Sequence, residues 1–154
     1  MKRRSFLAAT GAALAGASLP ASAQRFQPAQ DITPLIEKIT GGKKPEDGGI
    51  KIDLPAIAEN GNSVPMGIQV ESPMTEADHV AAIHILAERN PRPQIAVFHF
   101  SPASGRAQVD TRVRLAGTQK VTVIASLSGG RFRMARVDVL VTSAACLDEA
   151  TLAT

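Results

Sequence analysis

Between residues 50 and 141 the chain contains runs in which hydrophobic and polar residues alternate with a period of two, as in strands that bury one face. In the clearest run, 108–115, the odd positions are hydrophobic or Thr and the even positions are polar or charged. Turn residues separate the runs at short intervals, which predicts an all-β antiparallel sandwich of about seven strands. The predicted strands are 50–54, 64–71, 80–88, 94–100, 108–115, 119–127 and 131–141.

Two of these runs are less regular than the others. Residues 80–88 alternate at Ile83 and Ile85, but their alanines would also suit a helix. We interpret this run as a strand because Asn-Pro-Arg-Pro at 90–93 ends it abruptly and another strand pattern follows at once. Pro65, near the start of the second run, indicates a sheet edge or a bulge, since proline has no N–H to donate to a neighbouring strand.

Before the strands, residues 31–39 place hydrophobic residues at 32, 35, 36 and 39, which is the spacing of one helix face. Asp31 or Thr33 can cap this helix and Pro34 suits its first turn. A pair of glycines at 41–42 ends it. We therefore predict a short amphipathic helix that packs on a sheet or on a partner. The charged, glycine-rich residues that follow predict a solvated loop.

The first 23 residues have the features of an export signal. Residues 2–4 are Lys-Arg-Arg, a short run rich in alanine and glycine follows, and residues 21–23 form an Ala-Ser-Ala cleavage site. The paired arginines, followed by Phe-Leu, favour the twin-arginine route over an ordinary secretory signal. We predict a signal peptide at 1–23 and a mature domain at 24–141, followed by a C-terminal arm.

Removing the leader changes the charge of the chain. The full chain has 17 basic and 14 acidic residues, and the three basic residues of the leader leave 14 of each in a mature chain of 131 residues. That length suits one domain with one core. The near-neutral charge gives no basic surface for nucleic acid, and the absence of Trp and Tyr removes stacking platforms for bases. The apolar run of the leader is too short to span a membrane, so we predict neither a nucleic-acid nor a membrane partner.

Cys146 is the single cysteine of the chain, which excludes an internal disulfide. A leftover cysteine in an exported protein indicates intermolecular pairing or a free reactive thiol, although free cysteine is also often a small buried residue. His79, His84 and His99 show no metal-ligand spacing, so we predict no metal site and no cofactor. No histidine lies near Cys146 and no Gly-x-Ser-x-Gly occurs, so nothing indicates a hydrolase.

Cys146 lies in a C-terminal arm, 142–154, that follows the last predicted strand. Asp148 and Glu149 lie close to the thiol, and neighbouring carboxylates disfavour a thiolate. The thiol therefore suits passive attachment, with activation supplied by the enzyme into which it docks. If residues 141–146 are extended, they span roughly 17 Å at about 3.3 Å per residue, enough to bring the sulfur into another protein's cleft.

Five stretches, together with the leader and the cysteine, resemble the SoxY family of thiosulfate-oxidation sulfur carriers. They are Val-Glu-Ser-Pro-Met-Thr at 70–75, His-Ile at 84–85, Ala-Glu-Arg-Asn-Pro at 87–91, Phe-His-Phe-Ser-Pro-Ala-Ser-Gly-Arg-Ala at 98–107 and Thr-Arg-Val-Arg-Leu-Ala-Gly-Thr-Gln at 111–119. The resemblance implies an immunoglobulin-like sandwich, a periplasmic location and a heterodimer with a SoxZ-like subunit. It also implies that sulfur intermediates are bound covalently to the C-terminal cysteine, here Cys146.

The arm departs from the family's usual Gly-Gly-Cys-Gly-Gly. Here the cysteine lies in Ala144-Ala145-Cys146-Leu147-Asp148-Glu149, which is similar to a related branch whose arm reads Ala-Ala-Cys-Ile-Glu. Glycine leaves a backbone thin and free, whereas Ala, Leu and Glu restrict it and favour helix. We therefore expect this arm to serve different enzymes from those of the standard thiosulfate pathway.

The sequence thus predicts a non-enzymatic subunit that holds sulfur intermediates of the thiosulfate or sulfane type on Cys146 and presents them to sulfur-processing periplasmic enzymes. The alternative is a structural or interaction subunit of a periplasmic redox complex whose cysteine carries nothing. Solvent access to Cys146, and adducts on it, distinguish the two.

Overall fold

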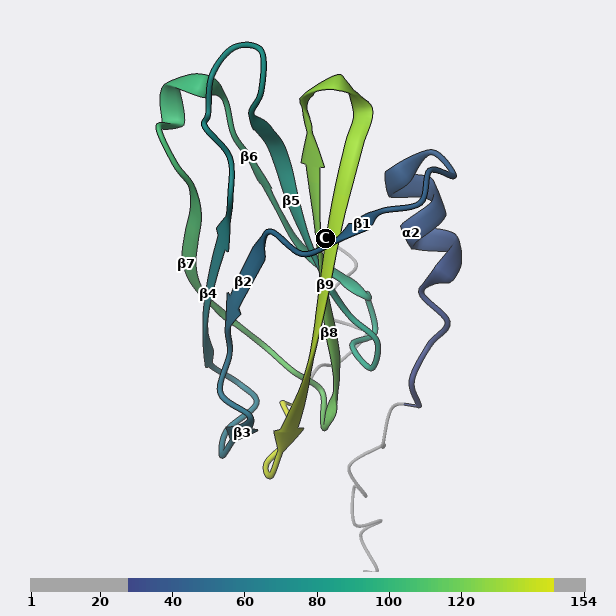
Figure 1. The fold of residues 1–154 in the computed structure, drawn as a ribbon. Coiled ribbons are helices and arrows are strands. Elements are labelled where there is room, and N and C mark those ends of the chain that lie inside the picture. Colours follow the sequence, from purple (N-terminus) through teal and green to yellow (C-terminus); the bar gives the residue numbers. More distant parts are fainter. Residues whose placement is uncertain (1–27, 146–154) are drawn as a thin grey trace, which may run out of the picture.

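The computed structural model describes residues 28–145 of the chain. Its elements are α2 (Thr33–Thr40), β1 (Glu46–Asp47), β2 (Ile50–Asp53), β3 (Ile57–Ala58), β4 (Val64–Val70), β5 (Val80–Ala87), β6 (Gln94–His99), η1 (Pro102–Ser104), β7 (Ala107–Val113), β8 (Gln119–Leu127), η2 (Ser128–Gly130) and β9 (Arg131–Val141). The strands form two facing sheets, an immunoglobulin-like sandwich (Figure 1). The larger sheet has the order β1-β9-β8-β5-β6, with β3 also paired to β9, and the smaller is β2-β4-β7.

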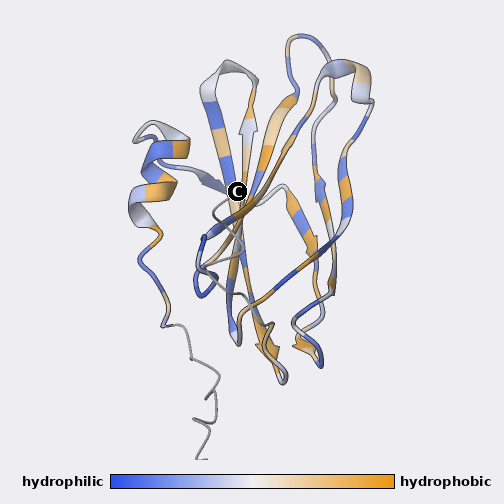
Figure 2. Ribbon diagram, turned by 180° about the vertical axis from the view of Figure 1, so that it is seen from behind, coloured by the Kyte–Doolittle hydropathy of each residue, from blue (hydrophilic) through white to orange (hydrophobic). Residues whose placement is uncertain are grey.

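The core lies between the two sheets. Alternate residues of β4 face inward, and Val64, Met66 and Ile68 are almost completely buried. They belong to one hydrophobic cluster with Ile83 and Ile85 of the larger sheet. Figure 2 shows the matching alternation of hydrophobic and hydrophilic bands along the strands. Each large aliphatic side chain buried in this way contributes about 1.5–3 kcal/mol.

Helix α2 packs on the outer face of the larger sheet (Figure 1). Its hydrophobic residues Leu35, Ile36 and Ile39 pack against a second cluster that contains Leu86 of β5 and Ile124 of β8. Both of these strand residues are fully buried. The prediction that the helix packs on a sheet is therefore confirmed.

The helix begins at Thr33, two residues later than predicted, and ends before Gly41 as predicted. Its N-cap is Ile32, which makes no side-chain cap hydrogen bond, so the prediction that Asp31 or Thr33 occupies the cap is wrong. The Asp31 carboxylate accepts a hydrogen bond from the Thr33 N–H over 2.9 Å, and the hydrogen bonds from Thr33 lower the pKa of Asp31. Gly41 adopts the left-handed conformation with φ 62° and donates its N–H to the Glu37 carbonyl. A glycine suits this position because it has no Cβ to clash in that conformation.

All seven predicted strands are present, with small shifts at their ends. β5 is the ambiguous run, and it lies inside the larger sheet between β8 and β6. The smaller sheet covers one of its faces and α2 partly covers the other. Both faces therefore carry hydrophobic residues, which weakens the alternation. Pro65 lies where β4 pairs with β7 alone, since β2 pairs only with 67–70, which confirms the predicted edge.

Two short strands correct the prediction of an entirely antiparallel sandwich of about seven strands. β1 falls in the predicted loop after the helix, and β3 falls between two predicted strands. Both pair in parallel with β9. Two residues are too few to show an alternating pattern, and these strands form through backbone pairing with an available edge. Within residues 28–145, no helix has the length and apolar character needed to cross a membrane.

Candidate functional site

The site predicted from sequence surrounds the cysteine near the C-terminus. Ala144 and Ala145 are within the described residues, whereas Cys146, Leu147, Asp148 and Glu149 lie outside them. Residues 142–145, which lead directly to the cysteine, are here called the arm root. Ala145 is buried, with 7% of its surface exposed. The arm root is therefore packed against the domain up to the residue before the thiol.

Backbone hydrogen bonds hold the arm root against two turns. The Gly61 N–H donates to the Ser143 carbonyl over 2.7 Å, and the Ala145 N–H donates to the Leu115 carbonyl over 3.0 Å. The two turns are joined to each other, because the Leu115 N–H donates to the Gly61 carbonyl over 2.8 Å. These three bonds link the turn before β4, the turn after β7 and the arm root into one unit.

The start of the arm root is fixed by the segment around β3. The Thr142 N–H donates to the Ala58 carbonyl over 3.0 Å, and the Thr142 hydroxyl donates to the Glu59 carbonyl over 3.0 Å. On the other side, the Val141 N–H donates to the Thr118 hydroxyl over 3.0 Å. The backbone is thus bonded on both sides as it leaves β9.

Gly61 is the position where this arrangement has no room for a side chain. A Cβ placed on Gly61 would lie 2.9 Å from the Ala145 nitrogen and 3.0 Å from the Ser143 oxygen, and closer still to the Leu115 oxygen. All three are backbone atoms, which cannot move aside as the end of a flexible side chain can. Glycine is therefore required for the close approach of the turn to the arm root.

Asn90 fixes the turn that carries Leu115. Its side-chain nitrogen donates to the Arg114 carbonyl over 2.8 Å, and its side-chain oxygen accepts the Ala116 N–H over 3.0 Å. The same oxygen accepts a hydrogen bond from Gln119 over 3.2 Å. Asn90 is 4% exposed. One buried side chain thus bonds the backbone on both sides of Leu115, and Leu115 in turn holds the arm root.

These contacts correct one expectation. Residues 141–145 do not extend away from the sandwich, because their backbone groups find partners in the neighbouring turns. The span of roughly 17 Å expected for an extended 141–146 is therefore wrong for the described residues. Cys146 follows an anchored residue, and a trans peptide places consecutive Cα atoms about 3.8 Å apart.

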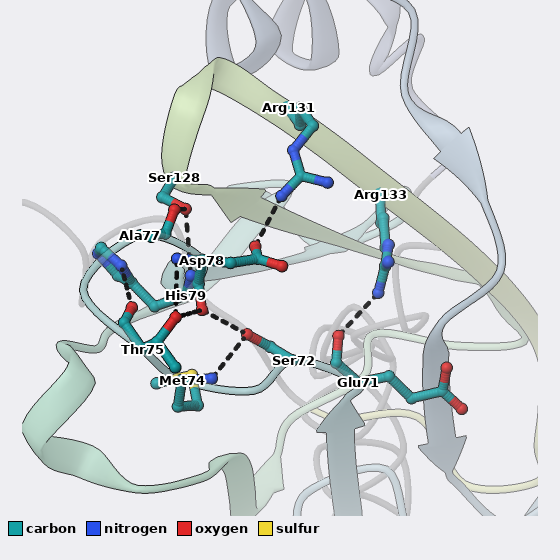
Figure 3. A network of polar contacts seen from close by, with 10 residues as sticks. All are labelled: Glu71, Ser72, Met74, Thr75, Ala77, Asp78, His79, Ser128, Arg131 and Arg133. Carbon is teal, nitrogen blue, oxygen red and sulfur yellow. Dashed lines mark hydrogen bonds and ion pairs between the residues drawn. The ribbon is translucent and has the colours of Figure 1, made fainter.

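The three histidines lie apart from the arm root. His79 precedes β5, and its Nδ1 lies 3.1 Å from the Thr75 carbonyl oxygen (Figure 3). The Nε2 of His84 lies 3.4 Å from the Ser126 hydroxyl, and its Nδ1 is buried without a hydrogen-bond partner. Burial lowers the pKa of His84, and repulsion from His99 on the adjacent strand lowers it further. Both effects favour the neutral imidazole of His84.

No group of three or more metal-binding side chains comes together within residues 28–145. Cys146 and its acidic neighbours lie outside that range. The absence of a metal site and of a cofactor in the whole chain stays a prediction.

Residues 36–146 match the family model described as "Sulfur oxidation protein SoxY". The chain belongs to the SoxY family. The match covers well over half of the chain and runs through Cys146. It therefore includes the arm root and the turns that hold it. A comparison with curated protein sequences gives no match.

Solved structures agree with this assignment. The sulfur carrier protein SoxY from Chlorobium limicola f thiosulfatophilum is 28% identical with a TM-score of 0.59, over 70% of this chain and 88% of that one. A superoxide reductase (neelaredoxin) from Ignicoccus hospitalis has a TM-score of 0.55 at 17% identity, over 61% of this chain and 80% of that one. The second likeness shows a shared fold.

Sequence reasoning missed Gly61, Asn90 and Leu115 as parts of the site. Gly61 reads as an ordinary turn glycine, and Asn90 reads as the end of a strand. Asn90 and Leu115 do lie in two of the stretches that resemble SoxY, which was the one signal pointing to them. Nothing local indicated that these turns meet the arm root, because the bonds join residues far apart in the chain.

Proposed function

We propose that this protein is a periplasmic carrier subunit that holds sulfur intermediates covalently on Cys146 and presents them to partner enzymes. The arm root carries the proposal, because the sandwich anchors the backbone through Ala145 and the cysteine follows directly. Membership of the SoxY family and the likeness to a sulfur carrier protein support it. A sandwich that anchors the backbone up to a single thiol suits a carrier better than a catalyst, since the described residues near the arm root include no histidine.

The chemistry assigns a clear task to the partner enzymes. When the Cys146 thiol bonds to the sulfane sulfur of thiosulfate, an S–S bond forms, the thiol loses its proton and two electrons are released. We assign no group of the carrier as the acceptor of these electrons. They must therefore pass to an oxidising partner enzyme that has an electron acceptor. Release of the cargo as thiosulfate, with return of the thiol, takes up two electrons and a proton, so that step needs a second partner that supplies a reductant. The adduct itself needs no metal or prosthetic group on this chain.

The assembly is part of the proposal. A SoxZ-like subunit forms the heterodimer that the family resemblance implies, and the twin-arginine leader exports the chain to the periplasm. This route carries folded proteins, so the domain can be complete before export. The proposed partners are proteins alone, because the mature chain has no basic surface for nucleic acid.

Intact mass of the protein purified from the native periplasm, with and without reductant, tests the carrier function. We expect a reductant-labile increment that maps to Cys146 and identifies the cargo by its mass. Cys146→Ser is the matched control, and it should lose the increment entirely. A thiol that stays unmodified after exposure to thiosulfate, sulfite and sulfide with periplasmic extract would instead favour the interaction-subunit alternative.

We further propose that the altered arm serves enzymes other than those of the standard thiosulfate pathway. The buried Ala145 supports this, because glycine at this position would remove a packed methyl group and add backbone freedom. Exchange of the arm to Gly-Gly-Cys-Gly-Gly should raise thiosulfate oxidation with standard pathway enzymes. A second variant changes only Ala144 and Ala145 to glycine. It separates the effect of backbone freedom before the cysteine from the effect of side-chain bulk after it. If the native arm already supports thiosulfate oxidation equally well, arm selectivity is wrong.

A further inference from the structure

Two large hydrophobic side chains are exposed on the domain although the alternating pattern elsewhere buries such residues. Ile57 is 61% exposed and Leu140 is 48% exposed. They are direct partners in the parallel pairing of β3 with β9. Their neighbours Ala58, Val139 and Val141 face the core, so Ile57 and Leu140 point the other way by the alternation of a strand. Figure 2 shows the ends of β3 and β9 as adjoining hydrophobic bands.

This exposed pair lies beside the arm root. The Leu140 N–H donates to the Ala56 carbonyl over 2.9 Å, and the Thr142 N–H donates to the Ala58 carbonyl over 3.0 Å. Ile57 therefore lies between Ala56, which is bonded to the end of β9, and Ala58, which is bonded to the first residue of the arm root. The hydrophobic pair and the departure point of the arm form one continuous surface.

The anchored arm root limits how far the thiol reaches. Cys146 follows the bonded Ala145 directly, so covalent geometry keeps its sulfur within about 7 Å of the Ala145 Cα. A protein that reacts with this sulfur must come close to Ala145 and so meets the surface around the arm root. Within residues 28–145, Ile57 and Leu140 are the large hydrophobic side chains that this surface leaves uncovered.

We propose that Ile57 and Leu140 form the docking surface for the enzyme that loads Cys146. The proposal rests on the carrier function proposed above. The partner is a protein whose reactive cleft is bordered by a small apolar patch, because burying two exposed aliphatic side chains is favourable only against an apolar surface. Covering the pair brings the cleft against the arm root, and the short anchored arm then places the thiol inside it.

The test compares the unchanged chain with the double variant Ile57→Ser, Leu140→Ser. Each protein is incubated with thiosulfate and limiting periplasmic extract, and adduct formation at Cys146 is followed by intact mass. Iodoacetamide without extract measures the accessibility of the thiol alone, and sedimentation with the SoxZ-like subunit measures assembly. Lys51→Ser, an exposed change in the smaller sheet, is the matched control. Thermal unfolding confirms that each variant is folded.

We expect the double variant to lose at least tenfold in extract-dependent loading, while its iodoacetamide rate, assembly and melting stay unchanged. Loading equal to that of the unchanged chain overturns the proposal. Loss of assembly would show that the pair belongs to the interface with the SoxZ-like subunit. A faster iodoacetamide reaction would show that the pair serves to hold residues 147–154 of this chain. Both results also overturn enzyme docking. If the unchanged chain acquires no adduct, the carrier function itself fails and the docking proposal fails with it.

Discussion

The two ends of the sandwich are held together in different ways. At one end, the hydroxyls of Ser72, Thr75 and Ser128 accept hydrogen bonds from loop N–H groups over 3.1–3.2 Å (Figure 3). Asp78 of this loop also pairs with Arg131 over 2.6 Å. At the other end, the arm root is held mainly by bonds between backbone groups. Side chains thus organise the loop between β4 and β5, and the backbone organises the departure of the arm.

This difference determines which changes each end tolerates. A loop held by several side chains loses one bond at a time when it is mutated. A backbone-held arm root tolerates many changes of its own side chains, because the Thr142 hydroxyl is the one side-chain group of residues 142–145 described as bonding it to the domain. It is sensitive at Gly61, where space is required, and at Asn90, where one side chain supports the backbone on both sides of Leu115.

The largest effect is expected for Asn90→Ala, which tests whether one side chain supports the backbone-held end. The change leaves the Arg114 carbonyl and the Ala116 N–H without this partner in a buried site, and we expect a loss of about 3 kcal/mol in the free energy of unfolding. Urea unfolding measures it. The exposed Asn62→Ala is the matched control and should cost less than about 0.5 kcal/mol. A loss equal to that of the control would contradict this role of Asn90.

Gly61→Ala tests the required space directly. The added Cβ must push against backbone atoms of Leu115, Ser143 and Ala145, so we expect a cost of about 2 kcal/mol. Hydrogen exchange measures where the cost falls. The Ala145 amide should exchange at least tenfold faster, whereas amides of the 72–79 loop should keep their rates. Unchanged exchange at Ala145 would show that Gly61 does not hold the arm root.

At the side-chain-held end, the Asp78–Arg131 pair should contribute less. Both side chains are almost half exposed, and such pairs contribute about 0.2–1 kcal/mol. A double-mutant cycle with Asp78→Asn and Arg131→Gln measures the coupling, which should shrink in high salt. The more exposed pair Lys120–Asp138, at 3.8 Å, is the control and should couple more weakly still. A coupling above about 2 kcal/mol would show that this pair dominates its end.

The smallest effect concerns His84, away from both ends. Because its pKa is lowered in the folded protein, the unfolded chain binds more protons below the ordinary value of 6.5, and stability falls as the pH falls through that range. His84→Gln should flatten this acid-side slope in urea unfolding between pH 7.5 and pH 5. His99→Gln should reduce it in part, because the repulsion is removed while burial remains. An unchanged slope in His84→Gln would assign it to other groups.

Much of the fold follows from local pattern. The seven longer strands and the helix were predicted because each has enough residues to show a period, and the turns contain the glycines and prolines that such turns need. β1 and β3 were not predicted, since two residues show no period. The candidate site was predicted only in part. The sequence indicated the cysteine through its uniqueness and its resemblance to SoxY, but not the anchoring of the arm root.

By itself, the sequence determined the sandwich, the family resemblance and the single thiol, because composition, alternation and motifs are local properties. The tertiary structure alone decided that the arm root folds back, that Gly61 and Leu115 hold it, and that Ile57 and Leu140 meet beside it. The physical reason is that backbone N–H and C=O groups are the same in nearly every residue. Which of them become partners depends on how distant turns come together, and no side-chain pattern records that.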